Sequence, residues 1–156
     1  MVSSVLSDGP SSRLTKKLVD DKKMALQVFA FNNSQEDYGS YLIGGLPLGD
    51  TSLDDLITEM DEEIEKMHTE LISERDYQKL QNKFENRFVN SNSSVEGIAG
   101  SLATYYMLYD DTSLINTEID IYRSITREEI KAAAVKYLQK GQRIILEYLP
   151  ETAKEN

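Results

Sequence analysis

The spacing of the β-favouring stretches constrains the fold more than any other feature of the sequence. Residues 24–31 and 38–48 are rich in apolar and aromatic side chains, and the turn-forming run Asn32-Asn33-Ser34 lies between them, which predicts an antiparallel hairpin. A third such stretch, residues 142–149 (QRIILEYL), comes only after a long helical region. It would have to pair with the hairpin at large sequence separation. We therefore expect an α+β fold, a two-layer α/β sandwich whose mainly antiparallel sheet is packed by several long helices.

The region between the hairpin and this last stretch has the three- and four-residue apolar spacing of helices. Ser52, Ser73 and Thr126 stand where N-caps belong, and Thr126 forms a full capping box with Glu129. The polar run at residues 90–94 predicts a kink or a break. Beyond it the apolar stripe continues through Val95, Ile98, Ala99, Leu102, Ala103, Tyr106 and Tyr109.

The N-terminal residues resemble the end of a helix more than its beginning. Residues 2–7 (VSSVLS) run into the turn signal Asp8-Gly9-Pro10, after which Ser11 or Ser12 is placed to cap a second helix. We expect an N-terminally truncated single domain over residues 1–150, followed by a disordered tail at residues 151–156.

Composition and charge exclude several function classes. The chain of 156 residues carries a formal charge of −10, which argues against non-specific binding to nucleic acid or to anionic membranes. No apolar run approaches the roughly 20 residues that a membrane helix needs. The chain has no cysteine and one histidine, so thiolate chemistry and a multi-histidine metal site are both excluded.

Two polar clusters invite a metal-binding interpretation. Glu65 and His68 form a Glu-x-x-His on a predicted helix, but helical di-metal sites use two such motifs and the second is missing. The acidic run Asp61-Glu62-Glu63 has a cation-binding composition, but on an amphipathic helix it is more simply the solvated face.

Other chemistry-bearing residues also have simple structural explanations. The nine tyrosines fall mostly on helix stripes, where core packing with the hydroxyl at the rim competes with a binding platform. Gly44-Gly45 lacks the helix and the Lys-Ser/Thr of a phosphate loop, and instead predicts a bulge or a close backbone approach. Nothing self-contained in the chain indicates an active site.

An ordered series of short motifs resembles one known family. The carrying segments are residues 6–14 (LSDGPSSRL), 18–25 (LVDDKKMA), the hairpin, 51–56 (TSLDDL), 73–76 (SERD), 125–130 (ITREEI) and the ending Tyr148-Leu149-Pro150. In this order they are similar to the C-terminal-type, non-zinc-binding domain of the insulinase/pitrilysin zinc metallopeptidases, the family of the mitochondrial processing peptidases. Each motif is weak alone, and the series covers nearly the whole chain.

The resemblance implies a part of a larger enzyme. Such enzymes close two halves around a chamber for unfolded peptides, and their zinc is held by an H-x-x-E-H motif in another domain. The implied partners are therefore the neighbouring zinc-binding domain, the opposite half of the clamshell and a peptide substrate. No cofactor is expected in this chain itself.

The same resemblance locates two positions where active-site chemistry would be expected. In family members that complete the site across the clamshell, the junction reads Leu-Arg-Glu-Lys-x-Gly-x-Ala-Tyr, and its Arg and Tyr contact the substrate. Here the Arg position is Val19 and the Tyr position is Leu26. Neither side chain offers a polar hydrogen bond to a peptide or an oxyanion, so we expect no catalytic residue.

The resulting hypothesis is a non-catalytic structural and substrate-chamber domain of a zinc peptidase, inactive by itself. An unpaired sheet edge would favour self-association of the isolated piece. One alternative is a peptidase-like scaffold or assembly domain with no active enzyme attached. Another is an unrelated acidic α+β binding module, which would lack a pairing between residues 25–48 and 142–149.

Overall fold

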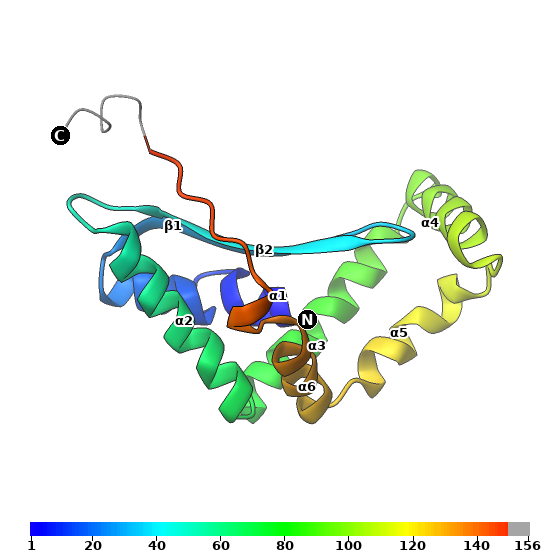
Figure 1. Ribbon diagram of the computed structural model, residues 1–156. Helices are drawn as coiled ribbons and strands as arrows, with labels where there is room; N and C mark the ends of the chain where they lie inside the picture. Colours follow the sequence, from blue (N-terminus) through cyan, green and yellow to red (C-terminus); the bar gives the residue numbers. More distant parts are fainter. Residues whose placement is uncertain (150–156) are drawn as a thin grey trace.

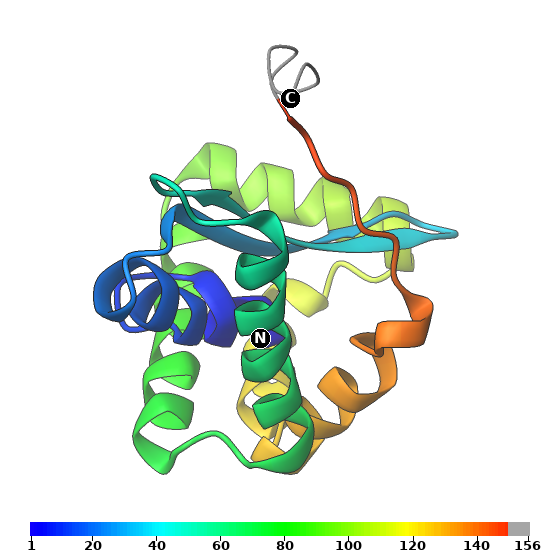
Figure 2. The same cartoon turned by 60° about the vertical axis from the view of Figure 1, so that its left-hand side comes forward.

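The computed structural model describes residues 1–149 and shows one antiparallel hairpin lying across a layer of helices (Figures 1 and 2). The elements are α1 (Val2–Ser7), the π-helix η1 (Thr15–Asp21), β1 (Ala25–Ser34), β2 (Gly39–Pro47), α2 (Leu53–Thr69), α3 (Glu74–Ser91), α4 (Val95–Tyr109), α5 (Leu114–Ser124), α6 (Arg127–Tyr137) and the 3₁₀ turn η2 (Lys140–Gln142). The α+β expectation is confirmed. The predicted tail at residues 151–156 lies outside the described residues.

The hairpin has one face toward the helices and one away from them. Val28 lies opposite Gly45 and Phe29 opposite Gly44, and the pairing is irregular between Ala25 and Gln27. Ala25, Val28 and Ala30 are buried, whereas Phe29 remains 41% exposed. Because side chains alternate along a strand, this pattern sends Val28 and Ala30 into the core and Phe29 outward.

The core joins the N-terminal elements to α2 and α6. Leu6, Leu14 and Leu18 are completely buried, and they supply the apolar anchor points of α1 and η1. The cluster is completed by Ala25, Val28, Ala30, Leu56, Met60, Met67, Ile72, Leu80, Ile130 and Ala134. The hairpin is thus fixed on a continuous apolar layer, to which α6 contributes from far along the chain.

The helix starts predicted at Ser52, Ser73 and Thr126 are confirmed, whereas η1 has no side-chain cap. The hydroxyl oxygens of Ser52 and Ser73 each accept a hydrogen bond of 3.1 Å from the backbone N–H three residues later. Thr126 and Glu129 form the complete capping box. The break at residues 90–94 separates α3 from α4. These features depend on residues a few positions apart, which explains why sequence alone located them.

The predicted C-terminal strand does not form among the described residues. In the sheet that they contain, β1 pairs only with β2. Residues 143–149 have no regular secondary structure, and Ile144, Leu146 and Tyr148 are 88, 89 and 97% exposed. A β-favouring pattern becomes a strand only when another strand supplies the hydrogen-bonding partners, and here the segment runs free of the hairpin's edges.

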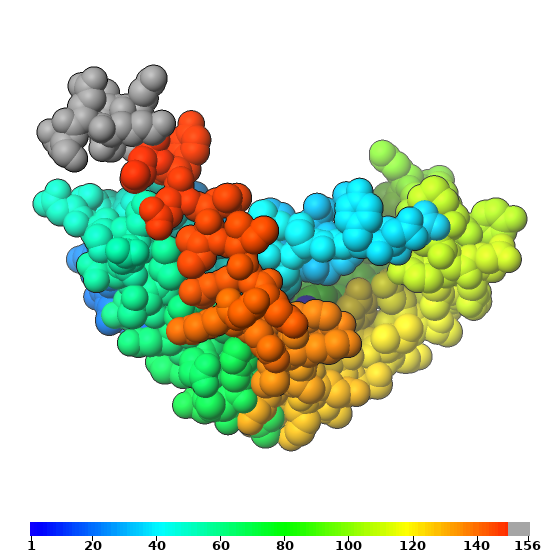
Figure 3. Space-filling view, viewed as in Figure 1, coloured from blue at the N-terminus to red at the C-terminus, as the bar shows by residue number. Residues whose placement is uncertain are grey.

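Helix α4 also departs from the sequence expectation. Its apolar stripe was expected to continue a packed helix face, but Tyr105 is the only buried side chain of α4 and none of α5 is buried. Figure 3 shows α4 and α5 as a lobe at the end of the molecule opposite α2, with α5 continuing directly into α6. The predicted helical period of the stripe is confirmed. The prediction that the stripe is buried within this chain is wrong.

Candidate functional site at the helix-to-strand junction

The passage from η1 to β1 has an unusual backbone. The Lys22 N–H donates to the Lys17 carbonyl at 2.9 Å, five residues back, and the Met24 N–H donates to Leu18 at 2.8 Å. Lys23 then adopts a left-handed conformation with φ of 52°. Ser12 does not cap this helix as expected, because its hydroxyl donates to the Gly9 carbonyl at 2.7 Å and closes the preceding turn. Since π-helical turns often occur at functional sites, the junction is the first candidate site.

The structure places Val19 and Leu26 in different environments. Val19 is half-buried against the core cluster. Leu26 is 61% exposed and is the extra residue where the β1–β2 pairing is irregular. Both side chains are purely apolar, so neither offers a polar group at the junction.

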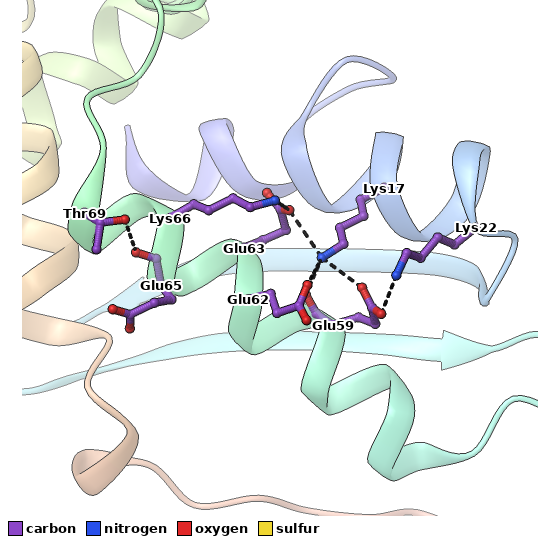
Figure 4. A network of polar contacts seen from close by, with 8 residues as sticks. All are labelled: Lys17, Lys22, Glu59, Glu62, Glu63, Glu65, Lys66 and Thr69. Carbon is purple, nitrogen blue, oxygen red and sulfur yellow. Dashed lines mark hydrogen bonds and ion pairs between the residues drawn. The ribbon is translucent and has the colours of Figure 1, made fainter.

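The polar group at the junction is a lysine clamp between η1 and α2 (Figure 4). Lys17 Nζ lies 2.8 Å from Glu59, 2.7 Å from Glu62 and 3.4 Å from Glu63. Lys22 also pairs with Glu59, and Lys66 lies 2.6 Å from Glu63. The side chain of Lys17 is only 15% exposed, so the centre of the clamp is shielded from solvent. Its periphery is open, because the side chains of Lys22, Glu62 and Lys66 are 44, 56 and 47% exposed.

The clamp holds its groups in their charged forms. Burial by itself would lower the pKa of Lys17, but hydrogen bonds and charge from Glu59, Glu62 and Glu63 outweigh it, and the pKa lies above its ordinary value. Hydrogen bonds from Lys17 and Lys22 lower the pKa of Glu59. A lysine that stays protonated cannot act as a base or nucleophile near neutral pH, so the clamp is structural.

A second clamp fixes the start of the C-terminal segment. Arg143 pairs with both carboxylate oxygens of Asp61, and Lys140 Nζ lies 3.1 Å from the same carboxylate. Burial raises the pKa of Asp61, but Arg143 and Lys140 outweigh this and the net pKa is lowered. The acidic run is therefore only partly a solvated face, since Asp61 and Glu63 are buried in ion pairs whereas the Glu62 side chain is 56% exposed.

The outward face of the hairpin is apolar. Phe29, Phe31, Leu42 and Leu46 are 39–55% exposed, and the strand register places them on the same face. The rings of Phe29 and Phe31 lie 5.9 Å apart. The period-two alternation in residues 28–31 contains this signal, which sequence reasoning used for the strand but not for a surface.

Two of the three glycines of β2, Gly44 and Gly45, permit close approaches, as the sequence predicted. The ring of Phe29 covers Gly44, where a side chain would collide with it. On the other face, a Cβ at Gly45 would lie 2.6 Å from Met60 Cε of α2. Gly44 thus lets the outward aromatic lie flat across the hairpin, and Gly45 lets α2 pack directly against the sheet.

The candidate metal ligands are explained by local contacts. His68 Nδ1 lies 3.5 Å from Glu65 on the same helix turn. Within residues 1–149, no group of three or more His, Cys, Asp or Glu side chains is arranged to hold a metal ion. Within the same range, no helix combines the length and the apolar composition needed to cross a bilayer.

The tyrosines divide between core and surface. Tyr105 is 8% exposed and donates to Glu118, while Tyr77 donates to the Ile125 carbonyl at 2.7 Å. These two fit the interpretation of a packed ring with a hydrogen-bonded hydroxyl. Tyr106 and Tyr109, which are 64 and 63% exposed, do not.

The geometry therefore gives a hairpin, two structural clamps and an apolar surface, with a junction that carries no reactive side chain. The model of the family described as "Peptidase M16 inactive domain" matches residues 1–84. The chain belongs to this family. The matched residues include the whole junction, the hairpin and α2. The resemblance found in the sequence is confirmed by this match. The missing pairing between residues 25–48 and 142–149 within the described part of the chain therefore does not indicate an unrelated module, contrary to the expectation from sequence.

Solved structures share the fold of this M16 inactive domain. A candidate zinc protease from Bordetella pertussis Tohama I superimposes with a TM-score of 0.83 at 24% identity, over 96% of this chain and 81% of that one. The inactive peptidase domain of a candidate zinc protease from Bordetella parapertussis superimposes with a TM-score of 0.81 at 24% identity. The match covers 95% of this chain and 78% of that one. A Helicobacter pylori protease superimposes with a TM-score of 0.81 at 23% identity, over 90% of this chain.

The extent of these matches differs between the relatives. This chain spans only 34% of the Helicobacter pylori protease, so that chain contains much besides the part similar to this one. At 23–24% identity the likeness concerns the fold. No curated protein matches the sequence.

Proposed function

We propose that this chain is the structural and substrate-chamber domain of a zinc-dependent peptidase, in which a separate H-x-x-E-H domain cleaves unfolded peptides. The observation that carries the proposal is membership of the inactive-domain family through residues 1–84. The junction supports it, since Val19 and Leu26 stand where a substrate-contacting Arg and Tyr would be needed. Zinc in the other domain would activate water for the attack on the peptide bond.

The outward hairpin face is the part that would form chamber wall. It combines exposed Phe29 and Phe31 with the edge of β2, which no third strand pairs within the described residues. The edge of β1 is partly occupied, since the Ala30 N–H donates to the Ser7 hydroxyl at 2.6 Å. An extended peptide can add to such an edge through main-chain hydrogen bonds, while apolar side chains hold it without sequence preference. This fits a substrate class defined by being unfolded.

The first experiment separates this domain from a catalytic one. We expect the purified chain to leave a labelled unfolded casein uncleaved with or without added zinc, and to show no stoichiometric zinc site by calorimetry. In the intact parent protein, we expect hydrolysis that a chelator abolishes. Chelator-sensitive hydrolysis by the chain alone would overturn the division of roles, and an inactive parent without H-x-x-E-H would favour the scaffold alternative.

The second experiment tests the chamber wall. Phe31→Ser removes an exposed ring from the hairpin face, and Ile144→Ser removes an equally apolar side chain from the C-terminal segment. We expect the affinity for an unfolded peptide, measured by fluorescence anisotropy, to fall about fivefold for Phe31→Ser. The reason is that a central aromatic contact is worth about 1 kcal/mol. Ile144→Ser should leave binding unchanged, and equal losses in both variants would place the peptide elsewhere.

A further inference from the structure

Helix α4 has an apolar character that its position does not explain. Over Val95–Tyr109 its only charged residue is Glu96. A helix that is apolar around its circumference is normally buried on all sides. Here Val95 is 85% exposed, Met107 75% and Tyr106 64%.

The exposed residues form one continuous stripe. Val95, Ala99, Ala103, Tyr106 and Met107 follow one another at steps of three, four and one along the helix, and all are exposed. The opposite side of α4 is occupied, because Tyr105 is buried there and donates to Glu118 of α5. The stripe thus runs the length of α4 on the side that faces away from α5, in the lobe seen in Figure 3.

We propose that this stripe is a self-association surface, on which a second copy of the chain docks its own α4 antiparallel about a two-fold axis near Ser101. This proposal is independent of the proposed function. An axis there places Val95 of one copy opposite Met107 of the other, and Ala99 opposite Ala103. The two small alanines allow the helix axes to approach closely, with the larger side chains packing on either side.

The charge distribution favours a second copy at this surface over the rest of the molecule. With a net charge of −10, two copies repel one another wherever acidic surfaces meet. The stripe on α4 contains no charge at its centre. Its ends carry Glu96 and Asp110. The antiparallel arrangement places Glu96 of one copy opposite Tyr106 of the other, about one helical turn from Asp110.

The available area matches a weak dimer. The exposed parts of Val95, Tyr106, Met107 and Tyr109 offer on the order of 100 Å² each, and those of Ala99 and Ala103 about 50 Å² each. The stripe, with Tyr109 at its edge, therefore supplies on the order of 500 Å² per copy, and the dimer about 1,000 Å², the lower limit for a specific interface. We expect a dissociation constant on the order of 10 μM.

The test is sedimentation equilibrium of the whole chain over a range of concentrations. Ala99→Glu puts a charge at the centre of the stripe on a residue that is exposed in the monomer. Ala132→Glu places the same charge on an exposed alanine of α6. We expect Ala99→Glu to weaken the dimer at least about tenfold, because the new carboxylate would be buried unpaired, and Ala132→Glu to have no comparable effect. Circular dichroism checks that both variants fold.

A gain of association provides an independent readout. Raising the salt concentration from 50 to 500 mM should tighten the dimer several-fold, because the repulsion between Glu96 and Asp110 is screened while apolar packing is not. Glu96→Gln with Asp110→Asn should reproduce this tightening at low salt. Asp110 has φ of 53°, a conformation that Asn tolerates.

Three results would overturn the proposal. The chain could remain monomeric at millimolar concentration. It could dimerise equally well as Ala99→Glu and as the parent chain. It could lose its dimer on Phe31→Ser rather than on Ala99→Glu, which would assign association to the hairpin.

Discussion

The two ends of the molecule show different relations between sequence and burial. We define the body as α1, η1, the hairpin, α2 and α6. Its apolar side chains pack against one another. Two long-range ion pairs, Lys17 with Glu59 and Arg143 with Asp61, connect segments far apart in sequence. In the lobe, defined as α4 and α5, equally apolar helices bury Tyr105 alone. The family match ends within α3, between the two. The match does not coincide with the core, because α6 lies outside it and still contributes Ile130 and Ala134 to the cluster. What distinguishes the lobe is an apolar surface that the described part of this chain leaves uncovered.

The largest effect should come from removing a side chain of the body's core. Leu18→Ala truncates a completely buried leucine, and we expect the free energy of unfolding to fall by about 3 kcal/mol. Val95→Ala makes a similar truncation on the lobe, where the side chain is 85% exposed. It should change the free energy of unfolding by less than about 0.5 kcal/mol. Urea unfolding of the dilute chain measures both. Similar losses would erase the distinction between body and lobe.

The lysine clamp should come next. Lys17→Met keeps most of the side-chain volume but leaves Glu59, Glu62 and Glu63 without their shared cation, and we expect a loss of about 2 kcal/mol. Lys16→Met changes an exposed lysine of the same helix and is the matched control, with a loss near zero. If the two variants unfold at the same urea concentration, the clamp is no more than a surface ion pair.

Sequence alone predicted what depends on neighbours along the chain. Thr126 and Glu129 lie three residues apart, so their capping box was readable. Asp61 pairs with Arg143, and Glu63 pairs with Lys17 as well as with the nearby Lys66. Because Arg143 and Lys17 lie far away in sequence, the acidic run was interpreted as a solvated face. The predictions of a strand at residues 143–149 and of a packed apolar face on α4 were wrong for a related reason. Periodicity tells which residues share a face, but it does not tell what covers that face.

The candidate site was predictable to the same degree. Aligning the family pattern on residues 18–26 located Val19 and Leu26, and the expectation that they carry no catalytic role stays a prediction. The clamps beside them were not foreseen, because a lysine on η1 gives no sign of the three carboxylates on α2 that surround it. Local spacing located the junction, and only the fold showed how it is held.

A smaller effect should come from the backbone of the junction. The glycine of the family pattern falls on Lys23, whose φ of 52° is unfavourable for a residue with a Cβ. We expect Lys23→Gly to raise the free energy of unfolding by less than about 1 kcal/mol, because the relief of strain exceeds the added entropy of the unfolded chain. Lys22→Gly, one position earlier in a right-handed conformation, should destabilise instead, and equal signs would contradict the strain argument.

The smallest effect should be a difference between lobe and body in how their contributions to stability depend on pH. Burial, followed by the hydrogen bond and charge of Glu118, raises the pKa of Tyr105 above its ordinary value. A raised pKa means that Tyr105 stabilises the folded state fully below the unfolded tyrosine pKa of about 10, and less as the pH rises through that value. The advantage of the parent chain over Tyr105→Phe in urea unfolding should therefore shrink between pH 9 and 11.

The body should respond differently over the same range. The pKa of Lys17 is raised above that of an ordinary lysine, so its contribution is complete below about 10.4 and declines only above it. The difference between the parent chain and Lys17→Met should thus stay constant up to about pH 10, where the Tyr105→Phe difference has begun to fall. If the two differences decline together, a single cooperative response governs both ends, and the lobe is as firmly held as the body despite its exposed surface.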